Sequence, residues 1–448
     1  MQCCDKIDCF EQGQICVPAT KLPRIIIVGG GFAGMKLVKS LKDHPVQLVL
    51  FDKNNYHQFI PLLYQVATSG IAPDSIVFPF RKIFRKYKNL VYRMAEVTQV
   101  QPKKNTITTS IGEISYDYLV LATGSTTNYF GNKDIERFGI GLKSVTDALD
   151  IRSYLLQNLE DAALKCIERD KIALGSIMIV GGGPAGVEMA GALAEFKKYI
   201  LPRDYPELKN TPVKIILCEG TGRLLQSMPE KLSDKTHRYL TNLGVDIRLN
   251  TMVKKYNRDL VEFANGETIR VSALIWTAGV MGKLVNGFGK ESISPQQRIF
   301  VNEFNKVEVL DHVFAIGDIA FMQTDGFPVG HPMVAQVAIQ QGKNLASNIL
   351  RTINKKPLRK FRYIDKGSMA TIGRRKAVAY INHIPVWGFT AWFLWSFIHL
   401  MGIIGVRNKV LVGLNWLWSY FTYDKGDRVI IRKYNPLLKD QTLEETLK

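Results

Sequence analysis

The chain contains 448 residues, of which 46% are hydrophobic and 22% are charged. These values predict two or three globular domains with their own cores, and they exclude intrinsic disorder. The net charge of +19 favours an anionic membrane surface over nucleic acid as a partner, because the basic residues cluster without forming a DNA- or RNA-reading motif. A solvated basic surface without a partner is the alternative.

Residues 1–23 are predicted to be an N-terminal extension. Its cysteines, Cys3, Cys4, Cys9 and Cys16, follow no known ligand spacing, so we expect no metal centre and a reducing compartment. The extension has no apolar core of the kind that a secretory signal requires, and its acidic residues argue against a transit peptide.

The first chemical motif is a glycine fingerprint where a predicted strand, 24–28, turns into a predicted helix, 35–41. Its residues are Gly29, Gly31, Phe32, Ala33 and Gly34. A G-x-G-x-x-G at such a turn lets a pyrophosphate approach the backbone at a helix N-terminus. The next predicted strand, 46–51, is followed directly by Asp52 and Lys53. The Asp52 carboxylate is the group that a bound ribose requires, and a solvated strand end is the alternative.

A further predicted strand, 118–122, runs into Thr123 and Gly124. Taken alone, such a strand would be ordinary core. The glycine turn that follows it is the feature that points to a cofactor, because this turn could lie beside one.

A second fingerprint follows the predicted strand 176–180 and opens a predicted helix, 187–196. Its residues are Gly181, Gly183, Pro184, Ala185 and Gly186. The next predicted strand, 213–218, ends at Glu219 after an inserted loop. A carboxylate there favours NADH, because it would repel the 2′-phosphate of NADPH, although Arg223 nearby weakens that preference. Two fingerprints predict two dinucleotides, a hydride donor and a hydride acceptor.

Two later strands repeat the strand-and-turn pattern, one ending at Gly279 and one at Gly317-Asp318. With them the chain resembles the two-dinucleotide-binding-domain flavoproteins. The resemblance implies an α/β fold of two Rossmann-like domains that hold FAD and NADH. It places FAD on Gly29, Gly31, Phe32, Ala33, Gly34, Asp52, Lys53, Thr123, Gly124 and Asp318, and NADH on Gly181, Gly183, Pro184, Ala185, Gly186, Glu219 and Gly279. The stretch 54–65 carries no cysteine, which argues against the disulfide-reductase branch.

The C-terminal part is basic and then strongly apolar. Ten Lys or Arg residues lie between Arg351 and Lys376, and only three polar residues interrupt 384–406. By length this stretch could span a bilayer, but Pro385 and Gly388 shorten the predicted helix and its aromatics favour the interface. We therefore expect a C-terminal membrane-associating helical segment. A true span and a buried dimer interface stay open.

For a membrane-bound flavoprotein without a redox disulfide, the expected electron acceptor is a lipid-soluble quinone. Three runs, 55–68, 331–342 and 367–377, resemble the type II NADH:quinone oxidoreductase family. The second contains the family's A-Q-x-A-x-Q motif, with Gln336 and Gln340 on one helical face. The resemblance implies that both glutamines serve the quinone, with Gln336 also near the flavin. It places Glu188 near the nicotinamide and Lys376 on the quinone side.

The resemblance implies transfer of hydride from NADH to FAD, and then of two electrons to ubiquinone or menaquinone, without proton pumping. The expected parts are FAD-binding residues 24–148 and 296–350, NADH-binding residues 149–295 and membrane-association residues 351–448. We expect a homodimer, peripheral on the cytoplasmic face of a cell inner membrane. The alternative is a sulfide:quinone oxidoreductase-like flavoprotein, which would need cysteines near the flavin.

Overall fold

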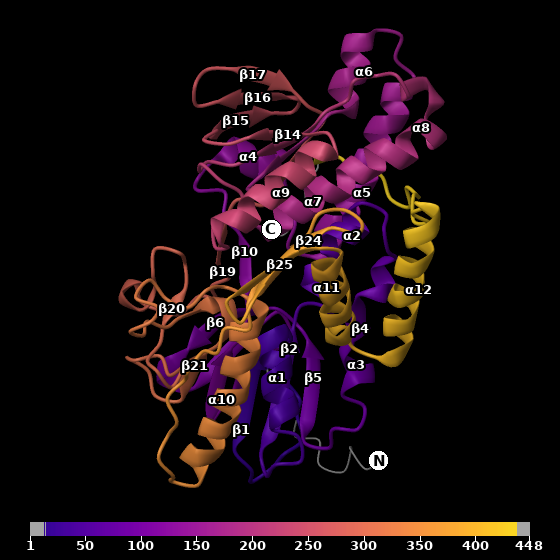
Figure 1. Cartoon of the computed structure of the whole chain (residues 1–448). Coiled ribbons are helices and arrows are strands. Elements are labelled where there is room, and N and C mark those ends of the chain that lie inside the picture. The colour runs from indigo at the N-terminus through magenta and orange to yellow at the C-terminus, as the bar shows by residue number, and fades with distance from the viewer. Residues whose placement is uncertain (1–12, 14, 437–448) are drawn as a thin grey trace. The chain divides into compact units, whose positions relative to one another are not determined.

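The computed structural model describes residue 13 and residues 15–436, and its contacts divide them into two compact units (Figure 1). Unit 1 draws on Met1–His57, Phe78–Thr126 and Val280–Asp365, and unit 2 on Gln58–Val77, Thr127–Gly279 and Lys366–Lys448. The C-terminal segment from Lys366 onward therefore belongs to the same unit as the second fingerprint. The five-part division expected from the sequence stays a prediction.

Unit 1 is built on a five-stranded parallel sheet in the order β21-β9-β1-β2-β5. Its strands are β1 (Arg24–Val28), β2 (Gln47–Asp52), β5 (Leu90–Met94), β9 (Tyr118–Leu121) and β21 (Val313–Ala315). The central strands are almost wholly buried runs of Ile, Val and Leu, as expected for a parallel sheet covered on both faces. Helices α1 (Phe32–Ser40) and α10 (Ala335–Ile353) pack against each other beside this sheet (Figure 1).

Smaller elements complete unit 1. An antiparallel sheet contains β6 (Val97–Gln101), β7 (Thr106–Thr109) and β8 (Gly112–Ser115), and the rest are α3 (Phe80–Ile83), β20 (Ile299–Phe300) and β22 (Ala320–Phe321). Strands β3 (Tyr56–Gln58), β4 (Val77–Pro79), β10 (Ser125–Thr127) and β19 (Val280–Gly282) lie where the chain passes between the units.

Unit 2 repeats the parallel design, with the strand order β11-β18-β12-β13-β14. Its strands are β11 (Ile140–Gly141), β12 (Ile177–Val180), β13 (Ile215–Cys218), β14 (Val245–Arg248) and β18 (Ala273–Trp276). Its helices before the C-terminal part are α2 (Leu63–Ala67), α4 (Lys133–Phe138), α5 (Val145–Ala163), α6 (Glu168–Gly175), α7 (Pro184–Glu195), α8 (Leu201–Asp204) and α9 (Glu230–Asn242). An antiparallel sheet is formed by β15 (Val253–Asn257), β16 (Leu260–Phe263) and β17 (Thr268–Arg270). In both parallel sheets the strand before the fingerprint is central.

The C-terminal part of unit 2 is a three-stranded antiparallel sheet followed by two helices. The elements are β23 (Ser368–Thr371), β24 (Ala377–Ile381), β25 (Ile384–Gly388), α11 (Phe389–Gly402) and α12 (Val406–Thr422). One expectation from the sequence needs correction. The apolar run 384–406 does not begin as a helix but as strand β25, because 384–388 pairs with β24. The polar residues 407–409 lie inside α12. Within residues 15–436, no helix is both long and apolar enough to cross a bilayer.

Candidate functional site

The first glycine turn joins β1 to α1. Gly29 has a φ of +104°, and a Cβ there would lie 2.3 Å from the Ala122 carbonyl oxygen. A Cβ at Gly34 would lie 1.9 Å from the Gly29 oxygen, so the helix can approach the strand only with glycine at both positions. Around Gly31, by contrast, no atom lies within 4 Å of the site of a Cβ. The start of α1, at Phe32 and the buried Ala33, is therefore open to a ligand.

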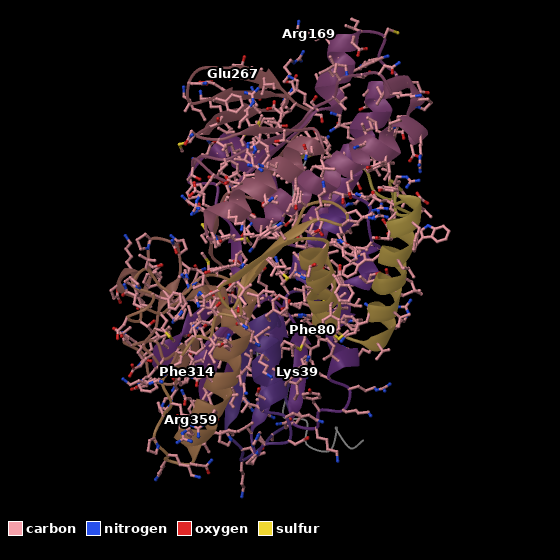
Figure 2. All side chains as sticks on the ribbon, in the orientation of Figure 1. Lys39, Phe80, Arg169, Glu267, Phe314 and Arg359 are labelled. Carbon is pink, nitrogen blue, oxygen red and sulfur yellow. The ribbon has the colours of Figure 1, made fainter. Side chains whose placement is uncertain are left out.

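Asp52 ends β2 and fixes this turn. Its Oδ2 accepts a hydrogen bond from the Gly30 N–H at 2.7 Å, and its Oδ1 accepts one from the Asn54 N–H at 2.8 Å. Burial raises the pKa of Asp52, while these two N–H donors act in the opposite direction. Phe80, labelled in Figure 2, packs so closely under Gly30 that a Cβ there would lie 2.3 Å from its ring. Asp52 is thus an organised acceptor, not a solvated strand end.

Thr123, Gly124 and Asp318 lie at the ends of neighbouring strands of the unit 1 sheet. Thr123 Oγ1 donates to the Lys283 carbonyl oxygen at 2.6 Å, and the Lys283 N–H donates to the Gly124 oxygen at 3.0 Å. Ser125 Oγ donates to Asp318 Oδ2 at 2.6 Å. Sequence reasoning missed Lys283, which no motif marks. Burial, and then the charge of the exposed Lys53, lowers the pKa of the Lys283 ammonium.

The amide side chains of α10 have two different roles. The buried Gln341, which sequence reasoning missed, accepts the Gly317 N–H at 2.7 Å and holds the turn before Asp318. Gln340 donates to the Ile364 oxygen at 2.8 Å and accepts the Ile364 N–H at 3.0 Å. Gln336, one turn earlier, donates to Asp365 at 3.5 Å. Gln336 and Gln340 therefore share a face of α10, as the spacing predicted, and they lie in its first two turns.

The second glycine turn, between β12 and α7, has the same geometry as the first. Gly181 has a φ of +112°, and a Cβ at Gly186 would lie 1.9 Å from the Gly181 oxygen. Gly183 again has no atom within 4 Å of the site of a Cβ, and Pro184 and Ala185 beside it are exposed. This helix start is also open to a ligand.

Glu219, directly after β13, takes the same position as Asp52. Its Oε2 accepts the Gly182 N–H at 2.6 Å, and its Oε1 accepts the Thr221 N–H at 2.9 Å and the Thr221 hydroxyl at 2.8 Å. Arg223 donates to the Gln226 carbonyl oxygen at 2.9 Å. Gly279 accepts the Asn128 N–H at the end of the neighbouring strand segment.

Glu188 lies in the second turn of α7 and is buried, so it does not face solvent. Its Oε1 accepts the Thr371 N–H at 3.3 Å and the Trp395 indole N–H at 3.2 Å. Burial raises the pKa of its carboxyl to about 8, against the effect of both donors. The His399 ring stacks on Trp395, with ring centroids 4.2 Å apart. Burial lowers the pKa of His399 to about 4, so this ring is neutral.

Lys376 lies directly before β24, and its Nζ is 4.9 Å from the centre of the Tyr239 ring. This cation–π contact fixes it on α9. For metals, no three His, Cys, Asp or Glu side chains among the described residues are grouped so as to hold an ion. Cys3, Cys4 and Cys9 lie outside the described residues.

The two turns fit dinucleotides. Each presents a helix N-terminus, an open glycine and a carboxylate at the end of the next strand, which are the groups that pyrophosphate and ribose require. In unit 1 these are Gly31 and Asp52, and in unit 2 they are Gly183 and Glu219. Both members of the predicted pair of cofactor sites are thus present as local structures.

Comparisons with known proteins extend this result. Residues 23–342 match the family described as Pyridine nucleotide-disulphide oxidoreductase, and residues 366–422 match the NDH2 C-terminal domain. Type II NADH:quinone oxidoreductase Ndh of Mycobacterium tuberculosis is 33% identical over 91% of this chain and 90% of its own length.

Two solved structures share the fold. NDH2 from Plasmodium falciparum, solved in complex with NADH, has a TM-score of 0.83 at 21% identity, covering 92% of this chain and all of that one. The sulfide:quinone oxidoreductase of Aquifex aeolicus has a TM-score of 0.68 at 19% identity, covering 95% and 96%. At these identities the likeness concerns the fold alone.

Proposed function

This chain belongs to the type II NADH:quinone oxidoreductase family, and we propose from this premise which of its residues carry each step. It is an FAD-dependent enzyme that oxidises NADH and reduces a quinone. The bound flavin supplies the redox chemistry, since it can accept a hydride and pass on electrons. The protein supplies the binding, the orientation and the protons.

In unit 1 the residues around Gly31 and Asp52 hold FAD. The N-terminus of α1 offers backbone N–H groups and a positive dipole end to the pyrophosphate. Asp52 is held by two backbone N–H groups and keeps its remaining acceptor capacity for the adenosine ribose. Asp318 is aligned by Ser125 on the neighbouring strand end, and it would accept from the ribityl or phosphate region of the cofactor.

In unit 2 the residues around Gly183 and Glu219 hold NADH in the same manner. The paired bonds to Thr221 orient the Glu219 carboxylate toward the ribose position. Because Arg223 bonds Gln226, the preference for NADH rests on Glu219, which would repel a 2′-phosphate. The observation that carries the whole proposal is that the chain contains two such glycine turns. In each, a carboxylate accepts a backbone N–H of the turn: Asp52 accepts that of Gly30, and Glu219 accepts that of Gly182.

Gln336 and Gln340 are the quinone-side residues. Amides can donate to a quinone carbonyl without a charge that must be desolvated. One N–H of Gln340 is already used by Ile364, which fixes the side chain, and its second N–H is the group that would reach a ligand. Lys376, fixed on Tyr239, is the cationic candidate on the same side of the reaction, and Glu188 is the buried acid that handles protons.

The two C-terminal helices, α11 and α12, expose apolar side chains that suit binding to a membrane surface. Phe393, Phe397, Leu417, Trp418 and Phe421 are each more than half exposed on α11 and α12. Such apolar area on neighbouring helices is costly in water, and with the basic clusters it suits an interfacial site on anionic lipid. We place the enzyme as a peripheral homodimer on the cytoplasmic face of a cell inner membrane. Its quinone is ubiquinone or menaquinone, and it pumps no protons.

The sulfide:quinone oxidoreductase alternative finds support only in the shared fold. Its chemistry would need cysteines at the flavin. Among the described residues Cys218 is buried in β13, and Cys16 and Cys166 are exposed. The Glu219 carboxylate in the second glycine turn favours a true nicotinamide site instead.

Anaerobic stopped-flow spectroscopy of the purified protein tests the proposal. Flavin absorbance should bleach on addition of NADH and return on addition of a soluble quinone analogue. Bleaching by NADH without return on quinone would contradict quinone as the acceptor. Bleaching by sulfide in place of NADH, followed by return on quinone, would favour the alternative.

A further inference from the structure

Unit 2 presents an exposed aromatic side chain, Phe130, on a strained tight turn. The turn runs from Tyr129 to Asn132, and the Asn132 N–H closes it by donating to the Tyr129 oxygen at 3.0 Å. Its central residues, Phe130 and Gly131, have φ values of +52° and +76°. Positive φ at both central positions is the pattern of a type I′ turn, which favours asparagine, aspartate or glycine at the first of them. A phenylalanine there is strained, because its Cβ crowds the backbone.

The turn is held in place by hydrogen bonds in which the Phe130 side chain takes no part. The Phe130 N–H donates to the Asn128 side-chain oxygen at 2.8 Å. The Asn128 N–H donates to the Gly279 oxygen at 3.0 Å, and the Trp276 indole N–H donates to the Asn128 oxygen at 2.8 Å. The Phe130 residue is 67% exposed, so its ring buries little area in return for the strain. Strained residues of this kind are concentrated at ligand-binding sites.

The Phe130 ring lies against the segment that packs on the second glycine turn. Its Cζ atom is 2.6 Å from the place where a Cβ of Gly279 would be, so only glycine at 279 admits the ring. The ring also meets the Trp276 ring edge-on, with centroids 6.4 Å apart. Directly before Gly279, the Ala278 Cα lies 2.7 Å from the place where a Cβ of Gly181 would be. Close contacts therefore join Phe130 to the turn that is open to pyrophosphate.

The strand order of unit 2 indicates which half of NADH the ring would meet. In the order β11-β18-β12-β13-β14, the glycine turn follows the central strand β12. Glu219, the proposed acceptor for the adenosine ribose, follows β13 on one side of it, whereas Gly279 and Phe130 lie beyond the end of β18 on the other side. A dinucleotide lies across the carboxyl ends of such strands. Its nicotinamide half therefore extends from the pyrophosphate toward β18.

We propose that Phe130 is a binding residue for NADH, and that its ring packs against the nicotinamide half. The inference rests on the proposed function, in which unit 2 binds NADH. An aromatic ring offers a flat apolar surface to the planar nicotinamide, and contacts between two such rings are favourable beyond the area that they bury. The exposure of the ring and the strain of its turn then have one cause, because the turn holds the ring where the ligand needs it.

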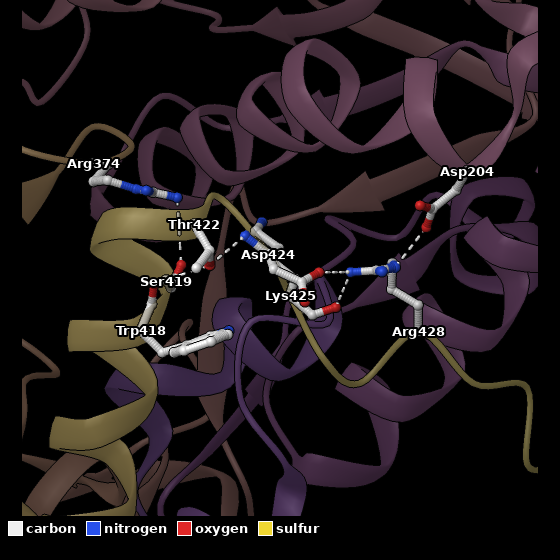
Figure 3. Close-up of polar contacts among 8 residues, drawn as sticks. All are labelled: Asp204, Arg374, Trp418, Ser419, Thr422, Asp424, Lys425 and Arg428. Atoms are coloured by element: carbon white, nitrogen blue, oxygen red, sulfur yellow. Dashed lines mark hydrogen bonds and ion pairs between the residues drawn. The ribbon is translucent and has the colours of Figure 1, made fainter.

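Substitutions at position 130 separate the effect of the ring from that of the strain. Phe130→Asn removes the ring and tolerates a positive φ, Phe130→Leu keeps the bulk and the strain, and Phe130→Tyr keeps the aromatic face. Arg258→Asn is the control for strain relief, because Arg258 is exposed and has a φ of +57° between β15 and β16. Arg428→Met is the control for lost stability, since it removes ion pairs to Asp204 at 2.6 Å and to Asp424 at 2.7 Å (Figure 3).

The measurement uses the flavin-loaded enzyme. It is mixed anaerobically with increasing NADH, and the dependence of the bleaching rate on concentration gives a Kd and a limiting rate. ADP-ribose, which carries the adenosine half and the pyrophosphate but no nicotinamide, is added as a competitor. Thermal melting is measured on the same samples.

Phe130→Asn should raise the Kd for NADH about 3- to 10-fold and leave the inhibition constant of ADP-ribose unchanged. Its melting temperature should rise by about 2 °C or more, because the strain at position 130 is relieved. Phe130→Leu should weaken NADH binding to a similar degree without this rise, and Phe130→Tyr should bind as the wild type does. Arg258→Asn should melt higher and Arg428→Met lower than the wild type, both with an unchanged Kd.

An unchanged Kd for NADH in Phe130→Asn would overturn the inference. So would an equal weakening of NADH and ADP-ribose, which would mean that the ring supports the glycine turn and does not contact the nicotinamide half. A wild type whose flavin does not bleach with NADH would instead contradict the proposed function, so the two failures are distinct.

Discussion

Glu188 accepts a hydrogen bond from the indole N–H of Trp395 at 3.2 Å, although 207 residues separate them in the sequence. This bond joins the helix after the second glycine turn to the first helix of the C-terminal part. The carboxyl is thereby sealed from solvent, and burial raises its pKa to about 8.

This burial predicts how stability depends on pH. A carboxyl whose pKa is raised on folding contributes stability that is complete below its unfolded value of 4.5 and is lost as pH rises through about 8. At about 1.4 kcal/mol per pKa unit, the loss is a few kcal/mol. Glu188→Gln keeps an acceptor for Trp395 but cannot ionise, so its urea unfolding free energy should fall less than that of the wild type between pH 5 and pH 8.5. Parallel curves would contradict the prediction.

Substitution of either open glycine by alanine should weaken dinucleotide binding and leave folding intact. Gly31 and Gly183 have negative φ values, and a Cβ at either would meet no protein atom within 4 Å. Gly31→Ala should therefore fold normally but purify with little flavin, and Gly183→Ala should keep its flavin but raise the KM for NADH at least 10-fold.

The matched control for these glycine variants is Gly29→Ala. It forces a side chain into a φ of +104° and against Ala122, so it should destabilise the protein itself. Flavin content and thermal melting distinguish the cases. Full flavin content in Gly31→Ala would show that the pyrophosphate does not approach there.

Gln341 should matter for flavin binding through the backbone. Gln341→Leu leaves the buried Gly317 N–H without its acceptor, at a cost of about 1–3 kcal/mol. Because Gly317 precedes Asp318, we expect both a lower melting temperature and partial loss of flavin. Added FAD should restore much of the melting temperature, and a variant that melts as the wild type does would refute this role.

Gln340→Leu should separate the two half-reactions. We expect slower reoxidation of the flavin by quinone with unchanged bleaching by NADH, since the amide donor is lost only on the quinone side. Asn344→Leu is the control, because Asn344 lies one turn later on α10 and also donates to a backbone oxygen, that of Arg359. If both variants slow the quinone step equally, the effect comes from loosening the segment that follows α10 and not from quinone contact.

The exposed faces of α11 and α12 predict membrane binding. Phe397 and Phe421 are 56% and 71% exposed, and replacing both with Asp should reduce binding to anionic vesicles by about 10-fold or more. Leu164→Asp is the control, because Leu164 is 80% exposed and follows α5. Vesicle sedimentation at low and high salt gives the measurement. Unchanged binding in the double variant would place the membrane contact elsewhere.

The sequence alone determined the parts of this protein whose chemistry is local. A glycine turn after an apolar strand has few conformations, so the open positions at Gly31 and Gly183 and the carboxylates Asp52 and Glu219 could be predicted from spacing. The four-residue spacing likewise predicted the shared face of Gln336 and Gln340.

Only the tertiary structure decided features that depend on packing between distant segments. The run 384–388 is a strand because β24 lies beside it, and α12 includes the polar residues 407–409 because Asn408 bonds the backbone at Asp74 and Ser75. The burial of Glu188 by Trp395 follows from the same cause. No local pattern records them, because the environment of a side chain is set by whichever segments pack around it.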